Sequence, residues 1–337
     1  MRFKQKGLFE FIATLISATV GITLALNHFG VWSLVIMQLI TAFITAVLYR
    51  TIEGGHGRLI FNKSSFKTYY KFGVNTSLAS VLNSIFDNIY QAILAKYFST
   101  TTAGLFYQAK KLQDIPVGIV KKLTQSVLFA GLSRIQDNES EFKKIYSNFI
   151  RLFTVLVGFI SLTLFLFSKE IVQIILGDQW LDSTFFLQIL SVVGYFHIQE
   201  IFNRLLFKIY DDTKYILYLE FIKKGIQSVS IIIGLYLARL DVLIYGLLIT
   251  TILSYFINYY FTYKRYSFLG MIELFTVCKV VLINIIIIFV LTRFIHFNTS
   301  VFDYFSKALC MLFLFFVGVI FFGIIQIKRD IKLLIKK

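Results

Sequence analysis

The sequence predicts an all-α, polytopic membrane protein with about ten transmembrane helices. Composition supports this fold class, because 57% of the 337 residues are hydrophobic, only 15% are charged, and Pro116 is the single proline. The arrangement supports it too, because apolar runs of about 20 residues, each long enough to cross a bilayer, follow one another along the chain. A soluble domain of this size carries far more charge, so most of the chain is expected within a membrane.

The apolar runs are separated by short polar or charged connections, which set the order of the elements. The expected spans are residues 8–28, 29–49, 72–97, 104–132, 148–168, 184–207, 215–238, 242–263, 271–295 and 305–327. The longest polar gap, which contains Gly54, Gly55 and Gly57, follows the second span, and a basic pair, Lys264 and Arg265, precedes the last two. We therefore expect a helix pair at 1–50, a cytoplasmic linker at 51–71, a six-helix unit at 72–265, and two further helices with a basic tail at 266–337.

The net charge of +16 is distributed as in a membrane protein and does not indicate a nucleic-acid partner. Basic residues gather at the two ends and in alternate connections, whereas the connection 168–183 carries Glu170, Asp178 and Asp182. The positive-inside rule then places both termini in the cytoplasm. A basic cytoplasmic face attracts anionic head groups, so membrane lipids are expected partners.

The span 104–132 carries a charged stripe. Its members fall within an arc of about 120° at 100° per residue. They are Lys110, Lys111, Asp114, Lys121 and Lys122. One lysine at mid-depth in a bilayer costs roughly 2.5–3.5 kcal/mol, so four facing lipid would cost on the order of 10 kcal/mol. The stripe is therefore expected to line a hydrated cavity.

The span 72–97 has a polar face of uncharged side chains and one carboxylate. Its members are Ser77, Ser80, Asn83, Ser84, Asp87, Asn88 and Gln91. Two interpretations stay open, because such residues either line a cavity or hydrogen-bond neighbouring helices that approach closely. The position of Asp87 near mid-depth favours the cavity, since an unpaired carboxylate facing lipid is unfavourable.

The span 215–238 adds Glu220, Lys223, Lys224 and Gln227 on one face. A glutamate followed by lysines three and four residues later favours an intrahelical ion pair, which would neutralise part of this cluster. With the lysines of span 104–132, the remaining charge predicts a cationic surface for an anionic substrate such as phosphate. The alternative is that Asp87, Asp114 or Glu220 couples transport to a proton or cation.

No pattern of a catalytic or metal site occurs in the chain. A phosphate-cradling Gly-Lys-Ser/Thr loop and a Gly-x-Ser-x-Gly elbow are both missing, and the cysteines and histidines have no metal-ligand spacing. The protein is expected to be a conduit and not an enzyme, without cofactors. Lys279 and Lys307, single charges in the last two spans, are expected to snorkel to the membrane surface.

The order and spacing of several short segments resemble the bacterial polysaccharide or O-antigen flippases. These Wzx-type proteins form a branch of the multidrug/oligosaccharidyl-lipid/polysaccharide exporter superfamily, together with lipopolysaccharide and teichuronic-acid exporters. The segments are Phe72-Gly73, Asn83, Asp87-Asn88, residues 95–98, residues 103–109, Ile115-Pro116, Leu128-Phe129, residues 132–137 and residues 220–224.

This resemblance implies two six-helix lobes that move an undecaprenyl-pyrophosphate-linked oligosaccharide across the bacterial cytoplasmic (inner) membrane by alternating access. Proteins of polysaccharide assembly are further implied partners. The polar positions of the family correspond to Asn83, Asp87 and Asn88. Its basic or polar positions correspond to Gln108, Lys111 and Lys224, and Gln108 stands where the family usually has arginine.

Residues 1–48 resemble the fifth and sixth helices of the first lobe. The chain would then hold half to three-quarters of a two-lobed flippase fold and lack about four helices. A fragment, a misassigned start or half of a split transporter is the expectation from this comparison.

Three other functions remain open at this stage. A membrane glycan polymerase or ligase would generally need a large outer loop, and the expected outer connections are at most about 16 residues long. A multidrug or cation exporter of the same fold would need an acidic and aromatic cavity, whereas the expected cavity is rich in lysine. A structural membrane scaffold would fit if the lysines are paired internally.

Overall fold

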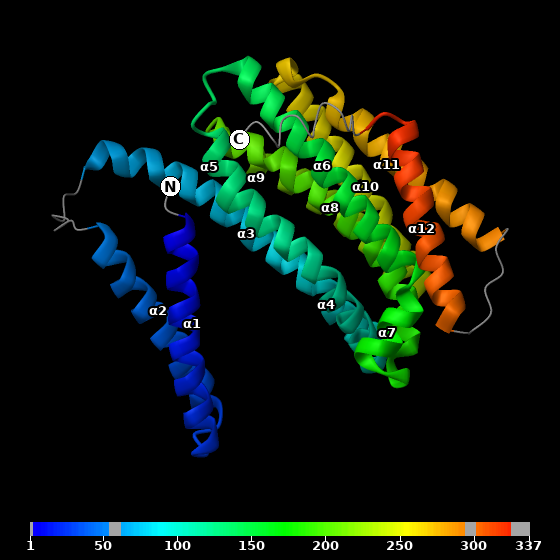
Figure 1. Ribbon diagram of the computed structural model, residues 1–337, viewed down its shortest axis with the longest axis horizontal. Helices are drawn as coiled ribbons and strands as arrows, with labels where there is room; N and C mark the ends of the chain where they lie inside the picture. The colour runs from blue at the N-terminus through cyan, green and yellow to red at the C-terminus, as the bar shows by residue number, and fades with distance from the viewer. Residues whose placement is uncertain (1–2, 54–61, 294–300, 325–337) are drawn as a thin grey trace. The chain divides into compact units, whose positions relative to one another are not determined.

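The computed structural model describes residues 3–53, 62–293 and 301–324, which form helices and connecting turns without a β-strand (Figure 1). The α-helices are α1 (Phe3–Leu26), α2 (Val31–Glu53), α3 (Lys63–Tyr97), α4 (Thr100–Leu123), α5 (Phe129–Leu132), α6 (Glu139–Leu166), α7 (Ser168–Leu176), α8 (Thr184–Ile209), α9 (Thr213–Tyr236), α10 (Leu240–Arg265), α11 (Ile272–Arg293) and α12 (Val301–Phe321). A π-helical segment (Thr124–Leu128) joins α4 to α5, and 3₁₀ turns (Asp178–Ser183 and Ser267–Leu269) precede α8 and follow α10.

The all-α membrane fold is confirmed. A long helix stands at each of the ten expected positions, and eight of these segments in the described ranges are long and apolar enough to cross a membrane. The other two, α3 and α9, correspond to the spans 72–97 and 215–238. They do not reach this level of hydropathy because each carries the polar face recognised in its sequence.

Several helices begin earlier than their apolar runs. Helix α3 starts at Lys63, within the segment expected to be a linker, and the Asn62 side chain accepts hydrogen bonds from the backbone N–H groups of Ser64 and Ser65 (2.9 and 3.3 Å). Helix α6 starts at Glu139, after Asn138, whose side chain accepts from the backbone N–H of Glu141. Such capping continues a helix into polar sequence, which a count of apolar residues does not detect.

The chain divides into two compact units, Met1–Phe66 and Lys67–Lys337. In the first unit, α1 and α2 form a hairpin in which the Thr41 hydroxyl donates to the Ser17 hydroxyl oxygen (2.7 Å). The turn between them places Gly30 at φ +53°, a conformation that glycine adopts without strain. The boundary lies within the expected linker 51–71, of which residues 54–61 are outside the described part, as is the basic tail 325–337.

Helix α8 is the central helix of the second unit and packs against α4, α6 and α10. Two apolar clusters meet along it. One joins α8 to α6, α11 and α12 through residues such as Ile150, Phe202 and Val280. The other joins its beginning to the end of α3 and the start of α4 through residues such as Leu94 and Phe106. This arrangement fixes α3, α4, α8, α9 and α10 around the space described below.

One turn ties together the ends of α8, α9 and α10. Arg265 and the Tyr266 hydroxyl both donate to the Asp212 carboxylate, at 2.9 Å in each case. Burial alone would raise the pKa of Asp212, but these hydrogen bonds hold its pKa below the usual range.

Helices α11 and α12 are part of the second unit, since α11 packs on α6 and α12 packs on α11. The expectation that their single lysines snorkel is wrong. Lys279 donates to the carbonyl of Phe322 (2.8 Å), and Lys307 donates to the carbonyl of Leu166 (2.8 Å) and lies 3.8 Å from the carboxylate of Glu170. Both ammonium groups therefore bind a backbone carbonyl at the end of a neighbouring helix.

Gly158→Ala is expected to loosen the contact between α6 and α11. A Cβ at this glycine would stand 2.2 Å from Cγ1 of Val280, a β-branched side chain with little rotamer freedom. Overpacking of this kind costs about 1–3 kcal/mol. Thermal unfolding of the purified protein measures the loss, and Val280→Ala in the same chain is expected to restore most of it. Equal destabilisation in the single and double variants would contradict this explanation.

Candidate functional site

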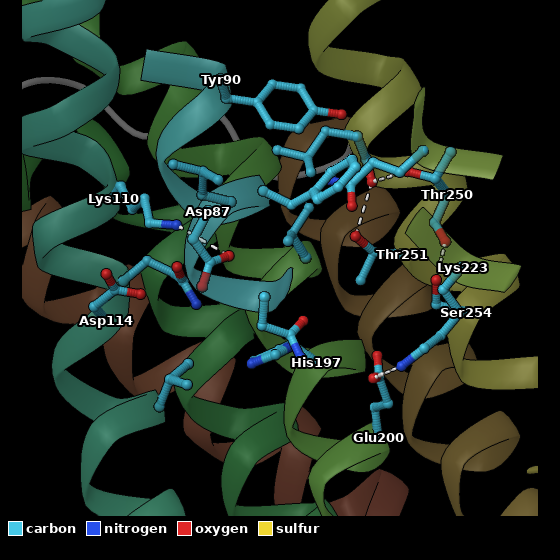
Figure 2. A pocket seen from close by; sticks show the side chains of 18 of the residues that line it. Asp87, Tyr90, Lys110, Asp114, His197, Glu200, Lys223, Thr250, Thr251 and Ser254 are labelled. Carbon is cyan, nitrogen blue, oxygen red and sulfur yellow. Dashed lines mark hydrogen bonds and ion pairs between the residues drawn. The ribbon is translucent and has the colours of Figure 1, made fainter. Parts of the chain in front are cut away.

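A polar cavity lies among α3, α4, α8, α9 and α10, within the second compact unit (Figure 2). Its volume is about 440 Å³. A smaller cavity of about 170 Å³ continues from it along α3 and α8. Four residues line both, namely Asn83, Asp87, Lys121 and His197. We refer to them as the large and the small cavity.

The cavities exist because α3 is apolar at its end and polar in its middle. At the end, Tyr90 and Leu94 are buried, and the Tyr90 ring stacks on Phe106 of α4 (6.5 Å between ring centroids). In the middle, the amide nitrogens of Asn83 and Asn88 donate to carbonyls of α3 itself, those of Ala79 and Ser84. Side chains that are satisfied within one helix do not pull a neighbouring helix close, which leaves room for a cavity.

Of the two interpretations of the polar face of α3, the lining of a cavity describes more of its residues than hydrogen bonding to other helices. Five of its seven expected members border one or both of them, namely Ser80, Asn83, Ser84, Asp87 and Asn88. Ser77 and Gln91 are not among the lining residues.

The charged stripe of α4 contributes less than the sequence predicts. Lys110, Asp114 and Lys121 line the large cavity. Lys111 and Lys122 are exposed and border neither of these cavities, and their role in binding substrate stays a prediction. Each follows a lining lysine, and one step along a helix turns a side chain by about 100°.

Gln108 also lies outside the lining of both cavities, and its role in binding substrate stays a prediction. It stands two residues before Lys110, which is about 200° around the same helix.

The α-helical hydrogen bonding of α4 changes to that of a π-helix in the segment after Leu123. There Thr124, buried beside the small cavity, donates to the carbonyl of Val120 (2.8 Å). Segments of this kind occur frequently at functional sites.

Glu220 and Lys223 take part in a buried ion-pair network that spans α8 and α9. Lys223 binds Glu200 and Glu220, the latter at 2.8 Å, and Arg204 binds Glu220 at 2.9 Å and lies 3.8 Å from Glu200. Two carboxylates face two cations, so the network is neutral. Lys223 borders the large cavity but is paired with Glu200 and Glu220, and its expected role as a ligand for an anion stays a prediction.

The large cavity is balanced in charge and not cationic as the sequence predicts. Its lining holds as many carboxylates as lysines, namely Asp87, Asp114, Glu200 and Glu220 with Lys110, Lys121, Lys223 and Lys224. The ammonium nitrogen of Lys110 lies 3.7 Å from a carboxylate oxygen of Asp87. Figure 2 shows these two side chains facing each other. Lys224 instead lies 5.1 Å above the ring of Phe86 and donates to the amide oxygen of Gln227 (3.2 Å).

The small cavity has an excess of positive charge. Lys121, Arg204 and Lys208 line it, with Asp87 as the carboxylate among the lining residues. In the described part of the chain, Lys121 and Lys208 form no ion pair, whereas Arg204 belongs to the neutral network. Two ammonium groups are therefore available to an anion here.

Sequence reasoning missed the contribution of α8. His197, Glu200, Arg204 and Lys208 all line a cavity and project from this helix, with His197 and Glu200 below the large cavity in the view of Figure 2. Their spacing of three, four and four residues places them on one helical face within or beside the span 184–207, a signal that could have found them. Thr250, Thr251 and Ser254 of α10 carry no charge and had no such signal.

Comparison with known sequences gives the family. The profile of the family described as "Polysaccharide biosynthesis protein" matches residues 1–185, more than half of the chain. The chain belongs to this family.

Individual relatives agree with this membership in the polysaccharide biosynthesis protein family. The chain is 26% identical over 204 residues to the lipopolysaccharide biosynthesis protein WzxC of Escherichia coli, and 19% identical over 180 residues to the succinoglycan biosynthesis transport protein ExoT of Rhizobium meliloti. It is 20% identical over 167 residues to the teichuronic acid biosynthesis protein TuaB of Bacillus subtilis. These alignments cover 58%, 53% and 48% of this chain but only 40%, 36% and 34% of the relatives.

Proposed function

We propose that the protein takes part in moving a lipid-linked oligosaccharide, carried on undecaprenyl pyrophosphate, across the bacterial cytoplasmic membrane for surface polysaccharide export. The observation that carries the proposal is the pair of connected polar cavities inside a largely apolar helical unit. Family membership supports it, as does the printed description of one relative as a transport protein.

The two cavities suit the two chemical parts of such a substrate. Phosphate oxygens bind ammonium groups through charge-assisted hydrogen bonds, and the small cavity offers Lys121 and Lys208. Sugar hydroxyls bind neutral donors and acceptors, which the large cavity supplies through Asn83, Asn88, Gln227, Thr250, Thr251 and Ser254. We therefore assign the pyrophosphate to the small cavity and the glycan to the large one.

Asp87, Asp114 and Glu220 were the candidates for coupling transport to a proton or cation, and we propose this role for the two aspartates. Asp87 and Asp114 are exposed to the large cavity, where a proton or cation can reach them. Glu220 is fully buried and bound to Arg204 and Lys223, so it is assigned to structure instead.

The same proposal covers organisation and orientation. Residues 1–50 form the end of one lobe, 51–71 the connection between lobes, 72–265 the second lobe and 266–337 an additional helix pair. Both termini face the cytoplasm, following the distribution of basic residues. Membrane lipids and polysaccharide assembly proteins are the further partners, and no catalytic step is assigned to the chain.

Lys121→Gln combined with Lys208→Gln is expected to reduce polysaccharide export at least about tenfold, because hydrogen bonds to charged groups contribute roughly 1.5–3 kcal/mol each. The variants are made in the complete gene product, in cells that depend on it for their surface polysaccharide. Export is measured as polysaccharide at the cell surface per amount of folded protein in the membrane.

Lys111→Gln combined with Lys122→Gln is the matched control. It removes the same charge from exposed positions on α4 that border neither cavity. Normal export by this control and low export by the cavity variant support the proposal. Equal export by both variants removes the phosphate assignment. Export of a lipophilic cation by the wild-type protein would favour a cation exporter, the alternative that Asp87 and Asp114 of the large cavity support.

A further inference from the structure

Glu273 is a buried carboxylate that borders neither the large nor the small cavity. It stands in the first turn of α11 and is 7% exposed. Asn203 donates to one of its oxygens (2.6 Å) and the Tyr146 hydroxyl donates to the other (3.4 Å). Because both oxygens accept hydrogen bonds, the contacts fit the ionised form of the side chain.

The charge of Glu273 has no counter-ion among the side chains described. None of the ion pairs in residues 3–53, 62–293 and 301–324 includes it. The ammonium group of Lys143 comes near, 3.9 Å from where a Cβ on Gly270 would stand, but it is not paired with Glu273. An ionised carboxylate in an apolar interior is costly unless a positive charge accompanies it.

A cavity of about 20 Å³ adjoins this carboxylate, which is room for one water-sized particle. Oxygen atoms dominate its polar lining. Thr262, only 4% exposed, and Tyr259 are among its lining residues, and within the described part of the chain neither hydroxyl has a hydrogen-bond partner. The Tyr266 hydroxyl, by contrast, is committed to Asp212.

The local backbone adds to the attraction for a positive ion. Thr262 lies in the last turn of α10, which ends at Arg265, and the negative end of a helix dipole favours cations. A single carboxylate with neutral oxygens suits one positive charge, whereas Ca²⁺ and Mg²⁺ call for several charged or hydrated ligands.

We propose that this cavity binds a monovalent metal cation, with Glu273 as the charged ligand and the hydroxyls of Thr262 and Tyr259 as neutral ligands. The site shares no lining residue with the large or the small cavity. It therefore stands or falls independently of the proposed transport function. Its effect is to hold α6, α8, α10 and α11 together at one end of the unit, since these helices supply Tyr146, Asn203, Thr262 and Glu273.

The test is the thermal unfolding of the purified chain in detergent, in sodium chloride, potassium chloride and choline chloride at one ionic strength. Sodium or potassium is expected to raise the unfolding temperature by about 3 °C or more relative to choline, in a saturable manner. Glu273→Gln is expected to abolish this rise, and Thr262→Val to weaken the apparent cation affinity about tenfold.

Glu139→Gln is the control, because it removes an exposed carboxylate near the same ends of the helices and should keep the full response. Equal unfolding temperatures in the three salts would show a protonated or merely hydrated Glu273 and overturn the proposal. A cation response that survives in Glu273→Gln would overturn it as well. If Glu273→Gln does not fold, binding of radioactive sodium to the wild type and to Thr262→Val decides by the same criteria.

Discussion

Glu220→Gln is expected to lower the free energy of unfolding by about 3–5 kcal/mol, the usual cost of removing one partner from a buried ion pair. Glu220 is fully buried and Lys223 is 4% exposed, so loss of the carboxylate leaves a cation that bulk water solvates poorly. The substitution leaves Lys223 and Arg204 sharing the single charge of Glu200. Thermal unfolding of the purified protein and its yield in the membrane both measure the effect.

A double variant separates charge balance from the loss of particular contacts. Glu220→Gln with Lys223→Met restores neutrality, since Arg204 and Glu200 remain, and it is expected to be more stable than Glu220→Gln alone. Glu170→Gln serves as the control, because its pair with Lys307 is partly exposed and is worth about 0–1 kcal/mol. A double variant no more stable than the single one would show that the network does not act through its net charge.

The helices could be predicted from the sequence because their signal is local. A run of apolar residues packs against either lipid or other helices. A single membrane-spanning segment can make all of its backbone hydrogen bonds internally only as a helix. The helix starts were less predictable, since Asn62 and Asn138 extend α3 and α6 into polar sequence through hydrogen bonds of single side chains.

The site was predictable only where one helix carried the whole pattern. The polar face of α3 indicated a cavity because its members share one side of one helix, and five of them line the space. Partners on different helices gave no such signal. Glu200 lies 23 residues before Lys223, and only the packing of α8 beside α9 shows that it neutralises this lysine.

Counting charges in the sequence did not give the net charge of the large cavity. Lysines on α4 and α9 suggested a cationic surface, but Lys111 and Lys122 do not border this cavity and Glu200 of α8 adds a carboxylate, so the lining is balanced. The excess of positive charge lies instead in the small cavity, which Lys208 of α8 lines. This shift changes which substitutions test anion binding.

Thr251→Trp is expected to block polysaccharide export almost completely while leaving the fold intact. Thr251 borders the large cavity from α10, and its hydroxyl donates only to the carbonyl of Leu247 in the same helix (2.8 Å). An indole ring placed there occupies the space assigned to the glycan. Overpacking against a bound ligand costs about 1–3 kcal/mol, which weakens binding by roughly fivefold to more than a hundredfold.

Two controls make this result specific to the cavity. Thr251→Val removes the same hydroxyl without filling the space, so it should reduce export far less than Thr251→Trp if the volume of the cavity matters. Ile249→Trp adds the same ring to α10 at a position that is 56% exposed and borders neither cavity, so it should export normally. Export by Thr251→Trp at the wild-type rate, in cells with equal amounts of folded protein, would mean that the glycan does not pass through this cavity. Because this substitution changes no charge, it tests the route of the substrate separately from the assignment of phosphate to Lys121 and Lys208.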